Sequence, residues 1–473
     1  MNNNSISQQR ELAEWISKTN FCDFPEEVVS HTKALLLKTV AGMIMGRREH
    51  VAPILTRYAT AMGGTPEAGV VAGGFRTSVE TAAFVNATIA HASELEDNQV
   101  PEQLSTFWVF PAFFSLAEKY QCTGREMIEA AVISFEIYSR YGRALGAVEM
   151  MQKMRTVPPS FFGPVAVAAG AAKMMKLSVD QIETAMSIAA THSCGICSGG
   201  HPGFDLHFLE SGSTCRNGIM AALLAKEGIT AATCVLETAV KTFGNVCFPE
   251  KGDADVLTEG LGTVPYSILD CRFKKYSACT LTHPAVDAFG LLAKEHGLKD
   301  EDIESIEILS GEHVHRTVSN TFNPATLEQA RFSTPFLIAE ILLYGKVDED
   351  TYSGPEKVQN QQNIDIQKKI TAVRMDDVSF GHVGAKITVV TKDGKTLVKE
   401  LEDRIGSPAY PLTLEQVVEI SRPFLASLLN TADCERVEEI MVNLDTELDM
   451  LEVMDIITYC RVGSRERFAK KIA

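Results

Sequence analysis

The chain has 473 residues, with 44 Lys and Arg against 61 Asp and Glu, which gives a formal net charge of −17. This acidic excess repels phosphate backbones, so we expect no nucleic-acid partner. Hydrophobic residues make up 45% and charged residues 22% of the sequence, a balance typical of folded globular proteins that argues against general disorder. At about 100–200 residues per domain, the length allows two or three domains.

The sequence gives no sign of export or membrane insertion. We find no run of about 20 apolar residues, the length that crosses a bilayer. The first residues, MNNNSISQQRELAEW, lack the basic-then-apolar pattern of a signal peptide. The 11 cysteines are a low density for this length. We therefore expect a cytoplasmic protein with reduced thiols and no membrane partner.

Apolar residues recur at helical spacing from about residue 8 to residue 245. Several of these predicted helices are rich in Ala and Gly, as in GPVAVAAGAAKMM and GIMAALLAKEG, and such helices can approach one another closely. Three capping boxes are predicted at helix starts: Thr77 with Glu80, Thr123 with Glu126, and Ser178 with Gln181.

The pattern changes near Ser267. IESIEILS and AKITVVTKDGKTLVKELED have the character of strands, and Asp393-Gly394 between two alternating runs predicts a hairpin turn. Helical spacing returns after about residue 409. The predicted fold is mainly α with an α+β insertion: a helical domain of residues 1–267 and 409–473, and a smaller α+β domain of residues 268–408.

Polar and ionisable side chains crowd the end of an otherwise apolar helix in NATIAHASELEDNQ, residues 86–99. If the helix continues, Glu94 lies three residues from both His91 and Asp97, so the three can share a face, next to Asn98. Clustered carboxylates can tune one another for proton transfer. A solvated helix end is the alternative.

A Gly-rich segment, residues 193–213, holds His201, Asp205 and His207. Loops of this kind can aim side chains at a substrate and offer backbone amides to a carboxylate. These three residues could instead bind a metal, but their spacing matches no strong zinc signature, so we expect no metal.

The segment FKKYSACTLTHPAVDAF, residues 273–289, places Lys274, Lys275, Tyr276 and His283 near the predicted domain junction. Domain junctions are favoured positions for ligand pockets, so these residues are candidates for substrate binding or catalysis. A structural histidine that only makes hydrogen bonds is the alternative.

Arg140 lies in a helix with mostly apolar neighbours, FEIYSRYGRAL. A partly buried Arg pairs with a carboxylate, and a structural ion pair is the stronger interpretation here, with a substrate carboxylate as the other. No Gly-rich nucleotide-binding signature occurs, so we expect no nucleotide cofactor.

Six segments in this order resemble the MmgE/PrpD family, which includes 2-methylcitrate dehydratase, cis-aconitate decarboxylase and iminodisuccinate epimerase. The resemblance covers nearly the whole chain. It implies a helical domain built from both chain ends, an inserted α+β lid, a homodimer, no cofactor, and a cleft between the domains for small polycarboxylates. The segments are NATIAHASELED, FEIYSRYGRA, FFGPVAVAAGAAKMMKLSVDQIETAMSIA, GIMAALLAKEGITA, FKKYSACTLTHPAVDA and QARFSTPFLIAEILLYGKV.

The resemblance carries some site positions onto this chain unchanged. The first family Asp falls on Glu94, which keeps the acid with one more methylene, and the second is kept as Asp97. The next position, often Thr, is Asn98. The Lys and His of the lid are kept as Lys274 and His283.

Other family positions differ. The His expected about ten residues after the first acid is absent from residues 102–106, and the His before the F-G-P turn falls near Val157. The Lys of a K-P-L-H segment falls on His207, and its His falls on Glu210, if GIMAALLA sets the register. These exchanges argue against 2-methylcitrate or cis-aconitate as the substrate.

The resemblance and the residues together predict a cofactor-independent lyase or isomerase. It would remove a proton α to a carboxylate or carbonyl of a small carboxylic acid, with His207 or His283 as the base. An isomerase is favoured because residues of the dehydratase and decarboxylase pattern are missing. The predicted catalytic residues are His207, His283, Glu94 and Asp97, and the predicted substrate-binding residues are Lys274, Arg140, Asn98, His201 and Tyr276.

Three alternatives remain open at this point. The reaction could be dehydration or decarboxylation of a small polycarboxylate. The chain could be a non-catalytic dimeric binding protein on an enzyme scaffold. It could also be a metal-dependent hydrolase that uses His201, Asp205 and His207.

Overall fold

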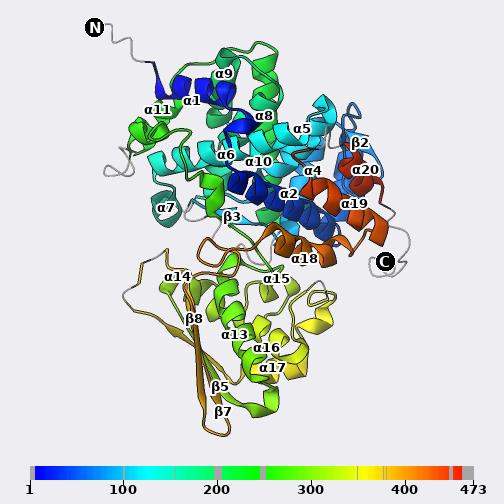
Figure 1. Ribbon diagram of the computed structural model, residues 1–473, viewed down its shortest axis with the longest axis vertical. Coiled ribbons are helices and arrows are strands. Elements are labelled where there is room, and N and C mark those ends of the chain that lie inside the picture. Colours follow the sequence, from blue (N-terminus) through cyan, green and yellow to red (C-terminus); the bar gives the residue numbers. More distant parts are fainter. Residues whose placement is uncertain are drawn as a thin grey trace. The chain divides into compact units, whose positions relative to one another are not determined.

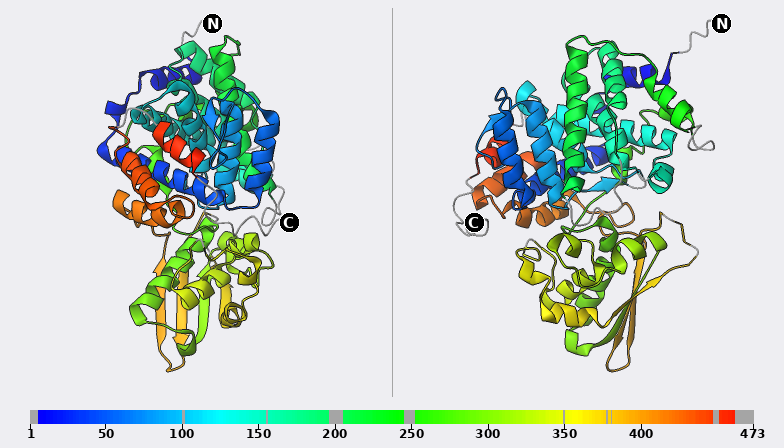
Figure 2. Two further views of the ribbon diagram at one scale, coloured as in Figure 1. Left: turned by 90° about the vertical axis from the view of Figure 1, so that its right-hand side faces the viewer. Right: turned by 180° about the vertical axis from the view of Figure 1, so that it is seen from behind.

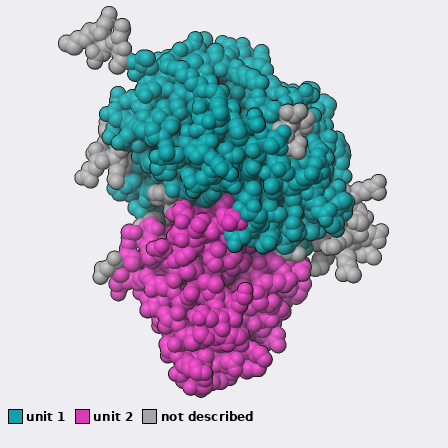
Figure 3. Space-filling model, viewed as in Figure 1, with its two compact units in different colours: residues 1–199, 205–271, 414–473 teal, residues 200–204, 272–413 magenta. Residues whose placement is uncertain are grey.

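The computed structural model describes residues 6–99, 102–154, 156–195, 205–244, 252–348, 350–376, 378–379, 381–446 and 451–460. The chain divides into two compact units, coloured separately in Figure 3. Unit 1 comprises Met1–Gly199, Asp205–Cys271 and Leu414–Ala473, and unit 2 comprises Gly200–Phe204 and Arg272–Thr413. The domain limits expected from the sequence, 1–267 with 409–473 and 268–408, stay a prediction.

Unit 1 is helical, as predicted, and draws its helices from both ends of the chain. Figure 1 shows α18 and α19, in orange to red, beside the dark blue α2, against which both pack. Its helices are α1 Gln8–Lys18, α2 Glu26–Gly46, α3 Val51–Met62, α4 Val79–Ala92, α5 Phe110–Tyr120, α6 Gly124–Leu145, α7 Ala147–Glu149, α8 Pro158–Met174, α9 Val179–Thr191, α10 Leu206–Lys226, α11 Val235–Ala239, α18 Leu414–Leu425, α19 Thr431–Val442 and α20 Leu451–Tyr459. Its short strands are β1 Ala68–Gly69, β2 Arg76–Thr77 and β3 Asn98–Gln99.

Helix α2 corrects the expectation that no segment is long and apolar enough to cross a bilayer. Among the described residues, this 21-residue helix is the one that is long and apolar enough to cross a bilayer, by length and composition alone. However, 83% of its most apolar stretch is buried inside the protein. Its apolar character therefore has a sufficient explanation as a central core helix of unit 1.

Gly218 lets α8 and α10 pack closely. A Cβ added at Gly218 would lie 2.4 Å from Cβ of Val167 and 2.9 Å from the carbonyl oxygen of Pro164. Both distances are below van der Waals contact, so only glycine fits at this crossing. The small-residue pattern of these two segments thus reports a close approach of helix backbones, as the sequence predicted. The right-hand view of Figure 2 shows α10 as a long green helix in unit 1.

Two of the three predicted capping boxes are confirmed. Thr123 and Glu126 cap α6 reciprocally, with the Thr123 amide donating to Glu126 over 2.8 Å, and Ser178 with Gln181 does the same at α9. The box at Thr77 is wrong, because Ser78 occupies the N-cap of α4 and accepts from the amide of Thr81.

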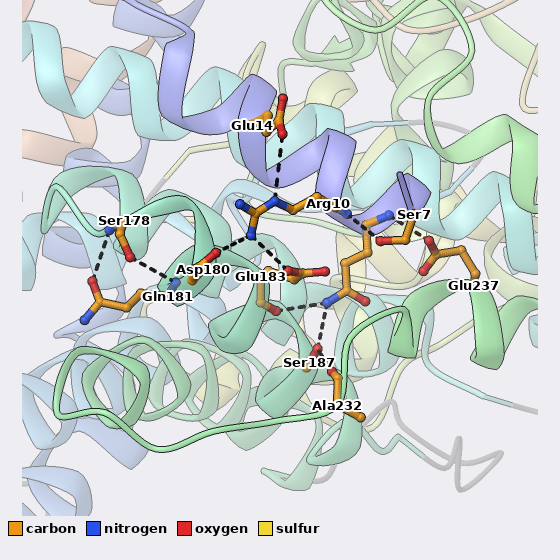
Figure 4. A network of polar contacts seen from close by, with 11 residues as sticks. Ser7, Arg10, Glu14, Ser178, Asp180, Gln181, Glu183, Ser187, Ala232 and Glu237 are labelled. Carbon is orange, nitrogen blue, oxygen red and sulfur yellow. Dashed lines mark hydrogen bonds and ion pairs between the residues drawn. The ribbon is translucent and has the colours of Figure 1, made fainter. Parts of the chain in front are cut away.

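The first helix is fastened to unit 1 by a polar network (Figure 4). The side-chain amide of Gln9 donates to the carbonyl of Glu183 at 2.9 Å and to the hydroxyl of Ser187 at 2.6 Å, both on α9. Arg10 pairs with Asp180 and Glu183 at the start of the same helix. These contacts hold α1 on α9.

Unit 2 contains a four-stranded sheet in the order β6-β5-β7-β8. The predicted hairpin is present: β7 and β8 pair antiparallel, and Gly394 at their turn has φ 84°. Strand β6 pairs parallel to β5, which the sequence did not predict. Helix α13 packs on β7 and β8 (Figure 1). The strands are β5 Ile303–Ser310, β6 Ile370–Arg374, β7 Ala385–Thr391 and β8 Thr396–Leu401, and the helices are α13 His283–His296, α14 Glu312–Val314, α15 Leu327–Ala330, α16 Thr334–Tyr344 and α17 Gln361–Gln367. Strand β4, Cys271–Arg272, contains the residues at which the units divide.

Candidate functional site

The end of α4 places the first candidate residues. The helix stops at Ala92, and Glu94 has φ 51°, in the left-handed region. The expectation that His91, Glu94 and Asp97 share one helix face is therefore wrong, because the chain leaves the helix before Asp97. A non-glycine residue in this region is uncommon and costs about 1 kcal/mol or more, which is typical of functional sites. The turn holds the Glu94 side chain within reach of α10.

Glu94 and two histidines form a cluster within unit 1. Oε1 of Glu94 lies 3.6 Å from Nε2 of His207, which is near the start of α10. The rings of His91 and His207 lie 4.5 Å apart between centroids. One ligand-capable atom from each of the three residues lies within 4.8 Å of the others. The structure therefore brings together two residues from the α4 segment and one from α10.

Glu210 adds a second carboxyl group near the other ring nitrogen of His207. Its Oε2 lies 3.9 Å from Nδ1 of His207, whereas Glu94 faces Nε2. Burial raises the pKa of Glu210 to about 7. An imidazole with a carboxyl group near each ring nitrogen can take up a proton at one nitrogen while the other is held by a carboxylate.

The cluster is mostly shielded from water. His91 and Glu94 are only 2% and 3% exposed, and the side chain of His207 is 24% exposed. The rings of Trp108 and Phe208 lie 5.4 and 5.8 Å from the His91 ring. Charge interactions are stronger in such surroundings than in water. His207 is the member of the three through which a small molecule could approach.

Asp97 and Asn98 lie just beyond Glu94 in the chain. Asp97 is fully buried, and its backbone carbonyl accepts from the amide of Thr106 at 3.0 Å. Asn98 is partly buried and forms a β-bridge with Ser105. The backbone of this segment is thus fixed by the residues that follow it. The catalytic role predicted for Asp97 and the binding role predicted for Asn98 stay predictions.

Unit 2 has its own polar cluster, centred on Asp287 of α13. Its Oδ1 accepts from Nζ of Lys275 and from the hydroxyl of Tyr276, each at 2.7 Å, and its Oδ2 accepts from the amide of Ile405 at 3.0 Å. Burial and the Asp287 charge raise the pKa of Tyr276 well above its ordinary value. Tyr276 is therefore a neutral hydroxyl that donates to a protein carboxylate.

His283 begins α13 and is fully buried. Its Nδ1 lies 3.2 Å from the carbonyl oxygen of Cys279, and its Nε2 accepts from the amide of Tyr276 at 3.4 Å. Burial and the charges of Arg404 and Lys274 lower the pKa of His283 well below its ordinary value. The ring is neutral at pH 7, and both nitrogens have backbone partners.

The remaining candidates have different surroundings. Lys274 is almost fully buried in unit 2. Arg140 is held in unit 1: Nε pairs with Glu136 at 3.2 Å, and the two terminal nitrogens donate to the carbonyls of Glu259 and Gly260 at 2.7 and 3.1 Å. These contacts favour its structural interpretation. His201 lies outside the described residues.

Comparison with known proteins identifies the family. The MmgE/PrpD N-terminal domain matches residues 10–254, and the MmgE/PrpD C-terminal domain matches residues 276–446. The chain belongs to the MmgE/PrpD family. The resemblance seen in the sequence is therefore confirmed.

Several MmgE/PrpD relatives match over most of their length. The cis-aconitate decarboxylase-like protein oryM of Aspergillus oryzae is 26% identical, with 95% of this chain and 96% of the relative covered. The cis-aconitate decarboxylase of Aspergillus terreus is 24% identical, with 96% of each chain covered. The cis-aconitate decarboxylase of Homo sapiens is 25% identical, with 89% of this chain and 88% of the relative covered.

The sequence of this MmgE/PrpD chain predicts no role for His91, a member of the cluster, or for Glu210, which lies beside it. In the sequence His91 is a neighbour of the acids, and Glu210 stands at a family His position. One signal was available, because His91 with Glu94 and His207 with Glu210 have the same three-residue spacing. That spacing on two segments predicts two His–Glu pairs, although it does not predict that they meet.

Proposed function

We propose that the protein is a lyase that transfers a proton at the carbon next to a carboxylate of a small carboxylic acid. His207 is the group that exchanges this proton. The observation that carries the proposal is the position of its ring, with Glu94 3.6 Å from Nε2 and Glu210 3.9 Å from Nδ1. The relatives named cis-aconitate decarboxylase support a lyase more than the isomerase that the sequence favoured.

The chemistry follows from the three side chains. In proton removal, the C–H bond breaks, the proton goes to Nε2 of His207, and the electron pair enters the enolate of the substrate. In decarboxylation, the C–C bond to the departing CO₂ breaks and its electron pair stays on the substrate carbon. That carbon then takes a proton from the His207 imidazolium and forms a new C–H bond. Glu94 stabilises the imidazolium in either case, because a carboxylate close by favours the charged form.

The substrate-binding role predicted for Lys274 also belongs to this proposal. Lys274 is buried in unit 2, where its charge is one of the causes that lower the pKa of His283. We retain this as part of the proposal, together with a homodimer and a small di- or tricarboxylate substrate.

The test is proton NMR in D₂O with a panel of small di- and tricarboxylates, cis-aconitate included. We expect deuterium at the carbon next to a carboxylate, with loss of CO₂ or water, for at least one member. His207→Gln should lower the rate at least 100-fold without changing the circular dichroism spectrum. His50→Gln is the matched control, since His50 is an exposed histidine outside the cluster and pairs with Asp205 at 2.8 Å.

Each outcome decides a different part of the proposal. Inversion without bond loss would restore the isomerase interpretation. Full activity in His207→Gln would reject His207 as the proton-transfer group. Absence of exchange with every carboxylate, in protein that binds them, would favour the non-catalytic binding protein.

A further inference from the structure

We propose that His91, Glu94 and His207 bind a divalent transition-metal ion of the Zn²⁺ type, and that the bound ion blocks proton transfer at His207. The metal site goes beyond the proposed function. Only the inhibitory effect of the bound ion rests on that function. Among the described residues, these three form the one group of His, Cys, Asp and Glu side chains with ligand atoms all within 4.8 Å of one another.

The donor set selects the class of ion. Two imidazole nitrogens and one carboxylate oxygen suit Zn²⁺ and similar ions, whereas Ca²⁺ and Mg²⁺ prefer oxygen ligands. Two histidines and one glutamate are also a known set for zinc sites that keep a fourth position open. The set differs from His201, Asp205 and His207, the metal alternative of the sequence: Asp205 is instead paired with His50.

The spacing of the donor atoms is compatible with a bound ion. Ligand atoms about 2.1 Å from zinc in a tetrahedral site lie about 3.4 Å apart. Oε1 of Glu94 and Nε2 of His207 are 3.6 Å apart, close to this value. The other pairs lie within 4.8 Å, so a shift of about 1 Å or a ring rotation brings them into range. His207 is the most exposed of the three, so its ring is the least confined by neighbouring atoms.

The surroundings add two features that stabilise metal sites. Glu210 lies 3.9 Å from Nδ1 of His207, and an outer carboxylate near this nitrogen can orient an imidazole that binds a metal through Nε2. Trp108 and Phe208 flank the His91 ring and provide an apolar shell. His91 and Glu94 are buried, so little water competes for the ion.

The inhibitory effect follows from the electron pair that the ion would use. Nε2 of His207 faces Glu94 and is the nitrogen to which we assign proton transfer. A nitrogen bound to a metal has no free electron pair and cannot accept a proton. Metal binding and proton transfer at this nitrogen therefore exclude each other.

Direct binding tests the site. Purified full-length protein is freed of metal with EDTA, and Zn²⁺ is then added in a calorimetric titration, with Co²⁺ absorption as a second readout. We expect one ion per chain, and at least 100-fold weaker binding in His207→Gln and Glu94→Gln. Glu210→Gln should bind about 10–100-fold more weakly. His50→Gln, which removes the exposed His–Asp pair, should bind like the wild type.

The results separate the two parts of the proposal. No stoichiometric binding by the wild type, or unchanged binding in folded His207→Gln and Glu94→Gln, would overturn the site. Where turnover of a carboxylate is measured, it should fall with the same midpoint as Zn²⁺ binding and return with EDTA. Full turnover by zinc-loaded protein would overturn the inhibitory effect and leave the site standing. A failure of the proposed function would leave the binding titration unaffected.

Discussion

Oε1 of Glu94 lies 3.6 Å from Nε2 of His207, although one residue follows α4 and the other lies in α10. The contact depends on the left-handed backbone at Glu94, which ends the helix and turns the carboxylate. Helices α4 and α10 pack on each other within unit 1. The distance between Glu94 and His207 is therefore set by the helical core rather than by a long loop. A proton-transfer pair held in this way needs little reorganisation during the reaction.

Replacing Glu94 with Gln should lower kcat about 100- to 1000-fold, because the amide cannot stabilise the imidazolium of His207. The side chain keeps its size, so the fold should be retained. Turnover of the carboxylate found in the NMR panel is the measurement. Glu80→Gln is the matched control, since Glu80 lies on the same helix α4 but outside the cluster. An equal loss in both variants would mean that the effect is structural.

His283→Gln should affect stability more than catalysis. Both ring nitrogens of His283 face backbone groups, so the substitution disturbs buried hydrogen bonds and should cost about 1–3 kcal/mol in the free energy of unfolding. We expect a smaller loss of kcat than in His207→Gln. Urea unfolding and turnover measured on the same samples check this. The reverse order of kcat losses would make His283 the base.

His31 should make stability depend on pH. Burial lowers the pKa of His31 to about 4, against its ordinary 6.5. Between these values the unfolded chain binds a proton that the folded protein does not, so stability falls as pH falls from 6.5 to 4, by up to about 3 kcal/mol. Above pH 6.5 His31 is neutral in both the folded and the unfolded chain, so this loss of stability is absent there. His31→Gln should flatten this part of the curve in urea unfolding at pH 7 and pH 5.

His296→Gln is the control for that prediction, because His296 is at the exposed end of α13. Two carboxyl groups, of the buried Glu118 and the partly buried Glu210, act in the opposite direction. Burial raises the pKa of Glu118 and of Glu210 to about 7. Each of these groups ionises more easily in the unfolded chain, so the free energy of unfolding falls as the pH rises toward 7. The difference between wild type and variant, rather than either curve alone, isolates His31. Equal pH dependence in wild type and His31→Gln would reject the assignment.

The sequence was most informative where a local rule acts alone. The hydroxyl and carboxyl of Thr123 and Glu126 are close in the chain, so their capping box could be predicted and is confirmed. The turn at Gly394 follows in the same way from a local pattern. The parallel partner of β5 could not be predicted, because β6 is brought to it by packing of distant residues.

The contact between two of the candidate residues could not be predicted from the sequence. The sequence makes Glu94 a candidate because polar groups crowd the end of an apolar helix, and it makes His207 a candidate because that residue lies in a Gly-rich segment. Their contact depends on the left-handed turn at Glu94, which no residue type nearby requires. The Thr77 box is wrong because Ser78 offers a competing hydroxyl one position later and is the residue that caps α4.

Gly218→Ala should destabilise the protein by about 2–3 kcal/mol, because the added methyl group would overlap Val167 and the carbonyl of Pro164 where α8 and α10 cross. Gly290→Ala on α13 is the matched control. There the nearest atom to an added Cβ is Ile341 Cγ2 at 3.9 Å, an ordinary contact, so the better helix propensity of Ala should stabilise by about 0.5–1 kcal/mol. Thermal unfolding of both variants gives shifts of opposite sign. A Gly218→Ala variant as stable as the wild type would show that the α8–α10 crossing can widen without cost.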